Sequence, residues 1–314
     1  MATFRIKRYN PEKQPEPYWE DFQLEFPEGA TLLDCLNEIK WTQDGSLSYR
    51  MSCRSAICGS CGMKANGHAL LACQRQAAHL LKDGSSTITI EPLGNLPVIK
   101  DLVVDMQQFW EKVEQVKPYL QDDGRPPEKE RRMSPEQFQL IDDATTCIMC
   151  GCCYSDCNTL EVDSRFLGPA ALAKAQRFVH DSRDQATYER IRELSEPGGI
   201  WDCTHCAECV ERCPKPTEPM YRIKELMEVA IEQGVTNNPG ARHALSFVKS
   251  IKHSGRLNEN TLPIESMGYF NIKGLMELVP VGLRMLLKGK IPPIIHKSID
   301  DVEDVRRICR ELGE

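Results

Sequence analysis

The spacing of the cysteines constrains this chain more than any other feature of its sequence. A run of four, C-x2-C-x2-C-x3-C-P, begins at Cys203, and a run with the same cysteine spacing begins at Cys147. Cysteines three residues apart are typical ligands of cubane iron–sulfur clusters, and the fourth cysteine of each run characteristically binds the other cluster. Two such runs therefore predict two neighbouring clusters that share ligands crosswise.

A different cysteine pattern lies nearer the N-terminus. Cys53, Cys58 and Cys61 follow the spacing C-x4-C-x2-C, and Cys73 follows at a distance. This is the spacing of plant-type [2Fe–2S] ferredoxins. An Asn-Gly pair at residues 66–67 is a strong signal for a tight β-hairpin. Pairing outward from that turn would bring Cys61 and Cys73 together.

The segments around this pattern predict a small α+β domain. Residues 3–9 and 20–26 alternate apolar and polar side chains, which predicts two half-buried strands, and residues 87–90 predict a further strand. Thr31 is a candidate N-cap for a helix with apolar side chains on one face between residues 32 and 39. Several short strands, one helix and a cysteine loop indicate a β-grasp ferredoxin domain.

Two glycines and one further cysteine have specific expected roles in this domain. We expect Gly59 and Gly62 to adopt positive φ angles that turn backbone N–H groups toward the cysteine sulfurs. Cys35, on the predicted helix, is expected to be a buried small hydrophobe rather than a ligand.

Beyond residue 97 the hydrophobic pattern becomes helical. It predicts helices at about 98–119, 168–181, 184–195 and 219–233, with the cysteine runs in the loops between helices. The charged, proline-rich stretch 121–135 is expected to be an exposed connection.

The predicted fold class is therefore α+β, in three parts. Residues 1–106 form a plant-type [2Fe–2S] ferredoxin domain, residues 107–235 form an α-helical, bacterial-type ferredoxin domain that holds two further clusters, and residues 236–314 form a helical extension that docks a partner or a membrane.

Composition supports metal binding and excludes other classes of function. Fifteen cysteines in a chain with no apolar run suited to a signal peptide favour metal ligation over disulfides. The net charge is −7 and the basic residues are scattered among acids, so we expect no nucleic-acid binding. No stretch is long and apolar enough to predict a membrane span.

The order of these motifs resembles that of a known family. A plant-type cysteine pattern, the segment Leu-Pro-Val-Ile-Lys-Asp-Leu-Val-Val-Asp-Met and two bacterial-type runs resemble, over about residues 1–235, the iron–sulfur subunits of succinate dehydrogenases and fumarate reductases. The resemblance implies an FAD-containing flavoprotein partner that oxidises succinate or reduces fumarate. It also implies that this chain passes electrons between that flavoprotein and a quinone-reducing membrane subunit, without a dicarboxylate site of its own.

The resemblance also implies which cysteines hold which cluster. The [2Fe–2S] cluster would be held by Cys53, Cys58, Cys61 and Cys73; the [4Fe–4S] cluster by Cys147, Cys150, Cys153 and Cys213; and the third cluster by Cys157, Cys203 and Cys209.

Cys206 departs from the family pattern. Most members have a non-ligating residue at this position and a [3Fe–4S] third cluster, whereas here a fourth thiolate is available at the right spacing. We therefore predict a second [4Fe–4S] cluster; the alternative is a [3Fe–4S] cluster with Cys206 merely buried. Three clusters with four thiolates each would leave Cys35, Cys152 and Cys309 without a cluster.

Two further departures concern the membrane side. After Cys157 the chain reads Asn158-Thr159-Leu160-Glu161-Val162, without the proline and tryptophans that help form the family's quinone pocket. The stretches 238–243 and 255–259 resemble small heterodisulfide-reductase-type subunits. Together they imply a cysteine-rich, heterodisulfide-reductase-like partner in place of the common membrane anchor. The alternative function is thus the electron-carrying subunit of a heterodisulfide- or thiol-linked fumarate reductase.

The expected location is the cytoplasmic face of the inner membrane, where the subunit is held peripherally by its partners. Residues 275–297 combine apolar and basic side chains, which fits either an interfacial membrane segment or packing against a partner subunit.

Two other interpretations are weaker. Pairs of C-x2-C also build zinc sites, but three-residue cysteine ladders and a distant fourth cysteine suit iron–sulfur clusters better. A freely diffusing ferredoxin would have no need for the long C-terminal extension.

Overall fold

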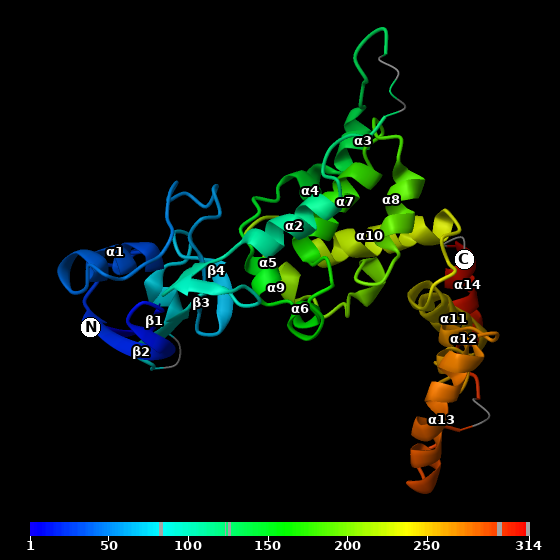
Figure 1. Ribbon diagram of the computed structural model, residues 1–314. Coiled ribbons are helices and arrows are strands. Elements are labelled where there is room, and N and C mark those ends of the chain that lie inside the picture. The colour runs from blue at the N-terminus through cyan, green and yellow to red at the C-terminus, as the bar shows by residue number, and fades with distance from the viewer. Residues whose placement is uncertain (82–83, 123, 125–126, 294–296, 312–314) are drawn as a thin grey trace. The chain divides into compact units, whose positions relative to one another are not determined.

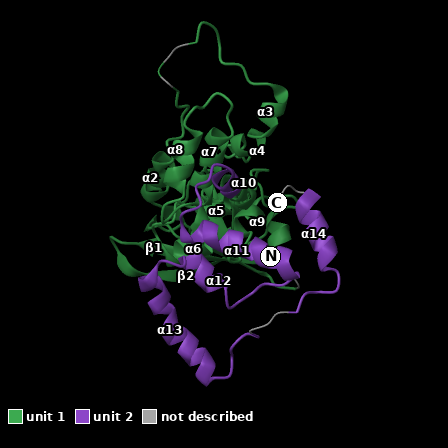
Figure 2. Ribbon diagram, turned by 90° about the vertical axis from the view of Figure 1, so that its right-hand side faces the viewer, with its two compact units in different colours: residues 1–226 green, residues 227–314 purple. Residues whose placement is uncertain are grey.

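The computed structural model describes residues 1–81, 84–122, 124, 127–293 and 297–311. It divides into two compact units, residues 1–226 and 227–314, with the border inside helix α10 (Pro219–Glu232) (Figure 2). The division at residues 106 and 235 stays a prediction.

Unit 1 begins with a five-stranded mixed sheet (Figure 1). Its strands are β1 (Ala2–Asn10), β2 (Gln14–Leu24), β3 (Gly62–Ala65), β4 (His68–Leu71) and β5 (Thr87–Glu91), in the spatial order β2-β1-β5-β3-β4. Strand β1 is antiparallel to β2 and parallel to β5, and its inward side chains Phe4 and Ile6 are fully buried beside Ile88 and Ile90. The strand predictions are confirmed, although β2 begins before residue 20, because its pairing with β1 continues to the turn, and ends at Leu24 rather than 26, because β1 begins at Ala2.

Helix α1 (Leu32–Thr42) confirms the predicted helix and its cap. Thr31 Oγ1 accepts from the N–H of Asp34 at 3.2 Å, and the carboxylate of Asp34 accepts from the N–H of Thr31 at 3.0 Å. This reciprocal pair satisfies two N–H groups that the helix itself cannot. Cys35 is buried on the helix, as expected.

The predicted helix at 98–119 is wrong at both ends. Residues 98–104 form a hairpin of β6 (Val98–Lys100) and β7 (Val103–Val104), and helix α2 covers Gln107–Gln115. Asp101, with φ of 46°, sits at the turn, and its buried carboxylate accepts from the N–H groups of Tyr9 and Ser48 and from Arg8. These long-range hydrogen bonds outweigh the local helical pattern, and the β-branched valines suit the extended backbone.

The rest of unit 1 is helical, as predicted. The helices are α3 (Pro135–Gln139), α4 (Asp142–Thr145), α5 (Cys152–Ser155), α6 (Asn158–Val162), α7 (Pro169–Val179), α8 (Thr187–Leu194), α9 (Glu208–Glu211) and α10, with short 3-10 turns at Ala77–Leu80 and Ile200–Asp202. The cysteine runs, however, do not lie wholly in loops: Cys152 and Cys153 are in the short helix α5 and Cys209 is in α9, because each run turns through one helical turn after its second cysteine. The small side chains of α7 are buried, so neighbouring helices approach it closely. In the described part of 121–135 most residues are exposed, as expected.

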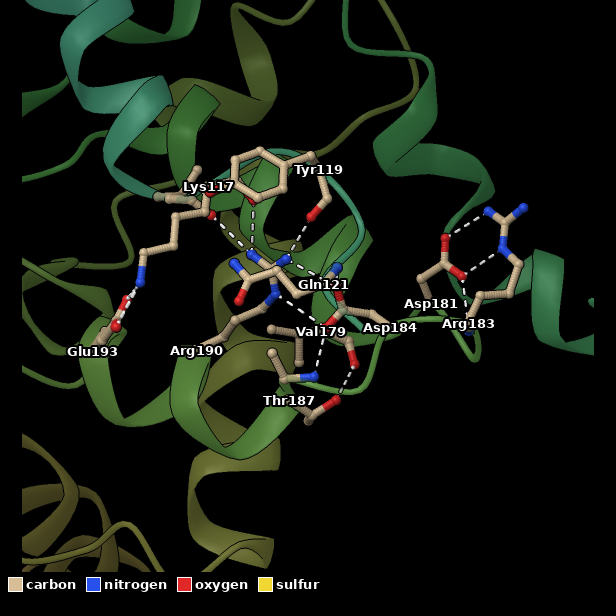
Figure 3. A network of polar contacts seen from close by, with 12 residues as sticks. Lys117, Tyr119, Gln121, Val179, Asp181, Arg183, Asp184, Thr187, Arg190 and Glu193 are labelled. Carbon is tan, nitrogen blue, oxygen red and sulfur yellow. Dashed lines mark hydrogen bonds and ion pairs between the residues drawn. The ribbon is translucent and has the colours of Figure 1, made fainter. Parts of the chain in front are cut away.

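A buried arginine joins the end of α2 to the α7–α8 region (Figure 3). The guanidinium of Arg190 donates to the carbonyls of residues 116, 117 and 119 at 2.6–3.0 Å and pairs with Asp184 at 2.9 Å. Both side chains of this ion pair are at most 4 % exposed. These three carbonyls lie beyond the end of α2. Arg190 supplies them with hydrogen-bond donors, which buried backbone carbonyls require.

Unit 2 contains the end of α10, from Met227, followed by α11 (Pro239–Ser254), α12 (Leu262–Met267), α13 (Ile272–Leu287) and α14 (Val302–Glu311). Asn238 caps α11 by accepting from the N–H of Ala241 at 2.8 Å, and Arg306 on α14 donates to the carbonyl of His253 at 2.8 Å. Of the predicted segment 275–297, residues 294–296 lie outside the described residues. Throughout the described chain, each helix is too short or too polar to cross a membrane.

Candidate iron–sulfur sites

The first site is a loop whose backbone points toward the cysteine sulfurs. The N–H groups of Ser55, Ile57 and Cys58 donate to Cys53 Sγ at 3.3–3.4 Å, and the N–H of Ala56 donates to Cys73 Sγ at 3.3 Å. These hydrogen bonds, led by that from Ser55, lower the pKa of Cys53 to about 6. A thiolate is the form that binds metal, so the loop is prepared for a cluster.

Positive φ angles produce this inward orientation, but not at both expected glycines. Arg54, Ala56 and Gly59 have φ of 56°, 56° and 73°. The expectation for Gly62 is wrong, since its φ is not positive. Gly62 is needed for space instead: a Cβ there would lie 3.0 Å from the carbonyl oxygen of Cys150.

The hairpin places the fourth cysteine of this pattern as predicted. Strands β3 and β4 pair around Asn66 and Gly67, whose φ angles of 50° and 82° suit a type I′ turn. The N–H of Ala72 then donates to the carbonyl of Cys61 at 3.1 Å, which brings Cys61 next to Cys73. Burial raises the pKa of Cys61 to about 12. Two thiols of this site are buried and two, those of Cys53 and Cys58, are exposed.

The second site gathers cysteines from both bacterial-type runs. Cys147, Cys150 and Cys153 line one small pocket, together with Cys213 from the other run. Cys152 does not line it. Instead the Cys152 thiol and N–H donate toward Cys150, and these contacts lower the pKa of Cys150 to about 7.

The third site is formed by Cys157 and the first three cysteines of the second run, Cys203, Cys206 and Cys209. Burial raises the pKa of Cys209 to about 12, and the neighbouring thiolates of Cys203, Cys157 and Cys206 contribute to the rise. Four sulfur atoms from both runs are therefore close enough to repel one another when ionised. A bound iron–sulfur cluster would offset this repulsion.

The two runs share one backbone conformation. Met149 and His205, which precede the second cysteines, have φ of 56° and 55°, and the residues that follow those cysteines, Gly151 and Ala207, have φ of 79° and 63°. Burial raises the pKa of Cys147 and that of Cys203. In each case the N–H two residues further on donates to the sulfur, and this hydrogen bond lowers the pKa and so opposes the rise. Cys206 thus occupies in its run the position that Cys150 occupies in the first. Its side chain is exposed and does not fill a core.

The cysteine groups differ from sites for a single ion. Among the described residues, no three His, Cys, Asp or Glu side chains converge where one metal ion could bind. An iron–sulfur cluster does not require its ligands to converge on one point, because its thiolates bind different iron atoms.

The first and second sites are in direct backbone contact. A Cβ on Gly59 would lie 2.9 Å from both Cα and Cβ of Cys150. Real Cβ atoms do not approach this closely, so only glycine permits the contact. The loop around the first site and the first bacterial-type run therefore lie against each other within unit 1.

Three polar residues that the cysteine patterns could not reveal hold these loops in place. Asp156 accepts from the N–H of Ala69 at 2.9 Å and pairs with Arg212 at 3.3 Å, which connects β4 to both runs. Asn95 donates to the carbonyls of residues 154, 155 and 157 at 2.9–3.2 Å. Lys112, buried near Cys157, donates to the carbonyls of residues 164 and 166 and brings a positive charge close to the third site. Their partners are remote in sequence, so no local signal marks them.

Comparisons with known proteins agree with this arrangement. Residues 3–111 match the model of the 2Fe-2S iron-sulfur cluster binding domain, and residues 143–216 match that of the 4Fe-4S dicluster domain. The chain is 40% identical over 237 residues to the fumarate reductase iron-sulfur subunit of Haemophilus influenzae, which covers 72% of this chain and 91% of that one. It is 37% identical to the succinate dehydrogenase iron-sulfur subunit of Coxiella burnetii, over 74% of this chain and 97% of that one.

A third relative extends further along the chain. The 8-methylmenaquinol:fumarate reductase iron-sulfur subunit of Wolinella succinogenes is 35% identical over 298 residues, 93% of this chain and 91% of that one. So long a match must include most of unit 2. In fold, the chain resembles one from the Sdh1 complex of Mycobacterium smegmatis in the apo form, with a TM-score of 0.68, 23% identity and coverage of 75% of this chain and 98% of that chain.

Proposed function

Because this chain belongs to the family of iron–sulfur subunits of succinate dehydrogenases and fumarate reductases, we propose that it transfers electrons between a flavoprotein subunit and a quinone-reducing membrane subunit. The observation that carries the proposal is the succession of three groups of cysteines within one compact unit, the first in backbone contact with the second. The chain is thus a subunit of an oxidoreductase, and succinate or fumarate would react on its flavoprotein partner.

The proposed ligands follow the grouping of the thiols. Cys53, Cys58, Cys61 and Cys73 would hold the [2Fe–2S] cluster, Cys147, Cys150, Cys153 and Cys213 a [4Fe–4S] cluster, and Cys157, Cys203, Cys206 and Cys209 the third cluster. When bound, the clusters supply one-electron carriers. The chain's own part is to present thiolates, to direct N–H groups at sulfur and to hold the loops together through Asp156 and Asn95.

The exposed thiols of Cys53 and Cys58 support the first site as the one that faces the flavoprotein. Ile57, between them, is 61 % exposed, and a partner that covers this loop would bury it. On the membrane side we propose a cysteine-rich, heterodisulfide-reductase-like subunit, which the stretches 238–243 and 255–259 of unit 2 support by their resemblance to small heterodisulfide-reductase-type subunits. The subunit would lie peripherally on the cytoplasmic face, held by its partners.

The proposed function is tested by isolating the complex. Affinity purification of the full chain from its native host, in mild detergent and without oxygen, is expected to recover an FAD-containing protein and a membrane component, with succinate-dependent reduction of a quinone analogue. Recovery of the iron-loaded chain alone, with no flavoprotein, would contradict it and favour a diffusing ferredoxin. A cysteine-rich membrane component would identify the heterodisulfide-like partner.

We propose that the third cluster is [4Fe–4S], with Cys206 as its fourth ligand. The shared backbone conformation of the two runs, in which Cys206 holds the position equivalent to that of Cys150, supports this assignment. The oxidised native protein should then lack a strong [3Fe–4S] electron paramagnetic resonance signal at low temperature. In the Cys206→Ser variant we expect that signal to appear with the loss of one iron per chain, because the fourth iron loses its thiolate.

Cys309→Ser is the matched control for this prediction. Cys309 lies in α14, and its loss should leave iron content and spectrum unchanged. A strong [3Fe–4S] signal from intact, anaerobically purified native protein would show that Cys206 is not a ligand.

A further inference from the structure

Helix α13 exposes an unbroken apolar stripe. Ile272, Met276, Val279, Leu283 and Leu286 are each more than half exposed, at 54–74 %. Their spacing of three or four residues places them on one face of the helix. Leu275, Leu278 and Met285, on a different side, are half-buried. A stripe of this length is unusual on a free surface and indicates a binding face.

Basic side chains accompany the stripe. Lys273 and Arg284 lie beside it at helical spacing, and Lys288 and Lys290 follow the helix end, whereas Glu277 is the one acidic residue between 272 and 290. An apolar face flanked by cations is the pattern of a helix that lies in the plane of a membrane surface.

We propose that α13 inserts its apolar stripe into the headgroup region of an anionic lipid membrane. At 16 residues the helix is about 24 Å long, shorter than the roughly 30 Å hydrocarbon core, so it suits the surface and not a span. Tyr269 and Phe270, directly before the helix, are 61 % and 98 % exposed, and aromatic side chains favour the membrane interface.

The charge balance selects a lipid surface over a protein groove. An apolar groove on a partner would accept the stripe, but it gives no reason for four cations around one acid. Anionic headgroups attract each of those cations, and the attraction adds to burial of the stripe. This contact would be a membrane attachment made by the chain itself, in addition to its partner subunits.

The test is co-sedimentation of the full, cluster-loaded chain with lipid vesicles. We expect binding to vesicles of phosphatidylcholine with phosphatidylglycerol, weak binding to phosphatidylcholine alone, and a loss of binding as salt concentration rises. Leu283→Glu should weaken binding at least about tenfold, because it places a charge in the stripe. The matched control is Val281→Glu, which adds the same charge at a position 50 % exposed on the opposite side of the helix. It should change binding less than about twofold.

Three results would overturn the proposal. The first is no binding to anionic vesicles at low salt, and the second is an equal effect of the two glutamate variants. The third is unchanged vesicle binding by Leu283→Glu together with loss of a protein subunit from the purified complex. Far-ultraviolet circular dichroism of both variants confirms that helical unit 2 has folded, and iron content confirms unit 1.

Discussion

Replacement of Gly59 by alanine is expected to destabilise unit 1 by about 2–5 kcal/mol and to disturb the contact between the first and second sites. A left-handed φ costs a non-glycine residue roughly 1–2 kcal/mol. The new methyl group would also lie 2.9 Å from backbone and side-chain atoms of Cys150, and relief of such overpacking adds about 1–3 kcal/mol. Since Cys150 is a proposed cluster ligand, the substitution should change both the free energy of unfolding and the magnetic interaction between the first and second clusters.

Gly67→Ala separates the two causes. Gly67 has a φ of 82°, but nothing lies within 4 Å of a Cβ placed there. It should therefore show the conformational cost alone, about 1–2 kcal/mol. Denaturant unfolding followed by visible absorption measures stability, and the magnetic interaction between the reduced first and second clusters reports their separation. An equal loss of stability in both variants, with the magnetic interaction unchanged, would show that the close contact with Cys150 is not important.

Loss of Arg190 is expected to destabilise unit 1 strongly, because it removes one partner of a buried ion pair. In the Arg190→Met variant, Asp184 keeps backbone N–H donors but loses its buried cation, and three carbonyls lose their donors (Figure 3). Removal of one partner from a buried ion pair typically costs about 3–5 kcal/mol. Arg190→Lys should recover only part of this, because an ammonium cannot reproduce the planar fork of donors.

Lys117→Met is the control for that prediction. Lys117 pairs with Glu193 at 2.7 Å, but both side chains are more than 40 % exposed, and such pairs contribute at most about 1 kcal/mol. Denaturant midpoints of the two variants, measured on cluster-loaded protein, give the comparison. If Arg190→Met is no less stable than Lys117→Met, the network of Figure 3 does not support the helical domain as inferred.

The sequence predicted most of the elements that carry the cysteines. The strands around residues 3–9 and 87–90, the capped helix after Thr31 and the hairpin at Asn66 depend on short-range patterns, and all are confirmed. The helix predicted at residue 98 failed because Asp101 bonds to Tyr9 and Ser48, which lie more than fifty residues away.

The sequence by itself determined the chemistry of the chain, through the spacing of its cysteines, and the α+β order of its domains. It could do so because the loops that wrap a cluster are short and their turns are local. Only the tertiary structure decided what surrounds those loops. It placed Gly59 against Cys150, joined β4 to both runs through Asp156, buried Arg190 and left the α13 stripe exposed. Each of these depends on side chains that are remote along the chain and adjacent in space, and contacts of that kind have no repeat or spacing in the sequence to reveal them.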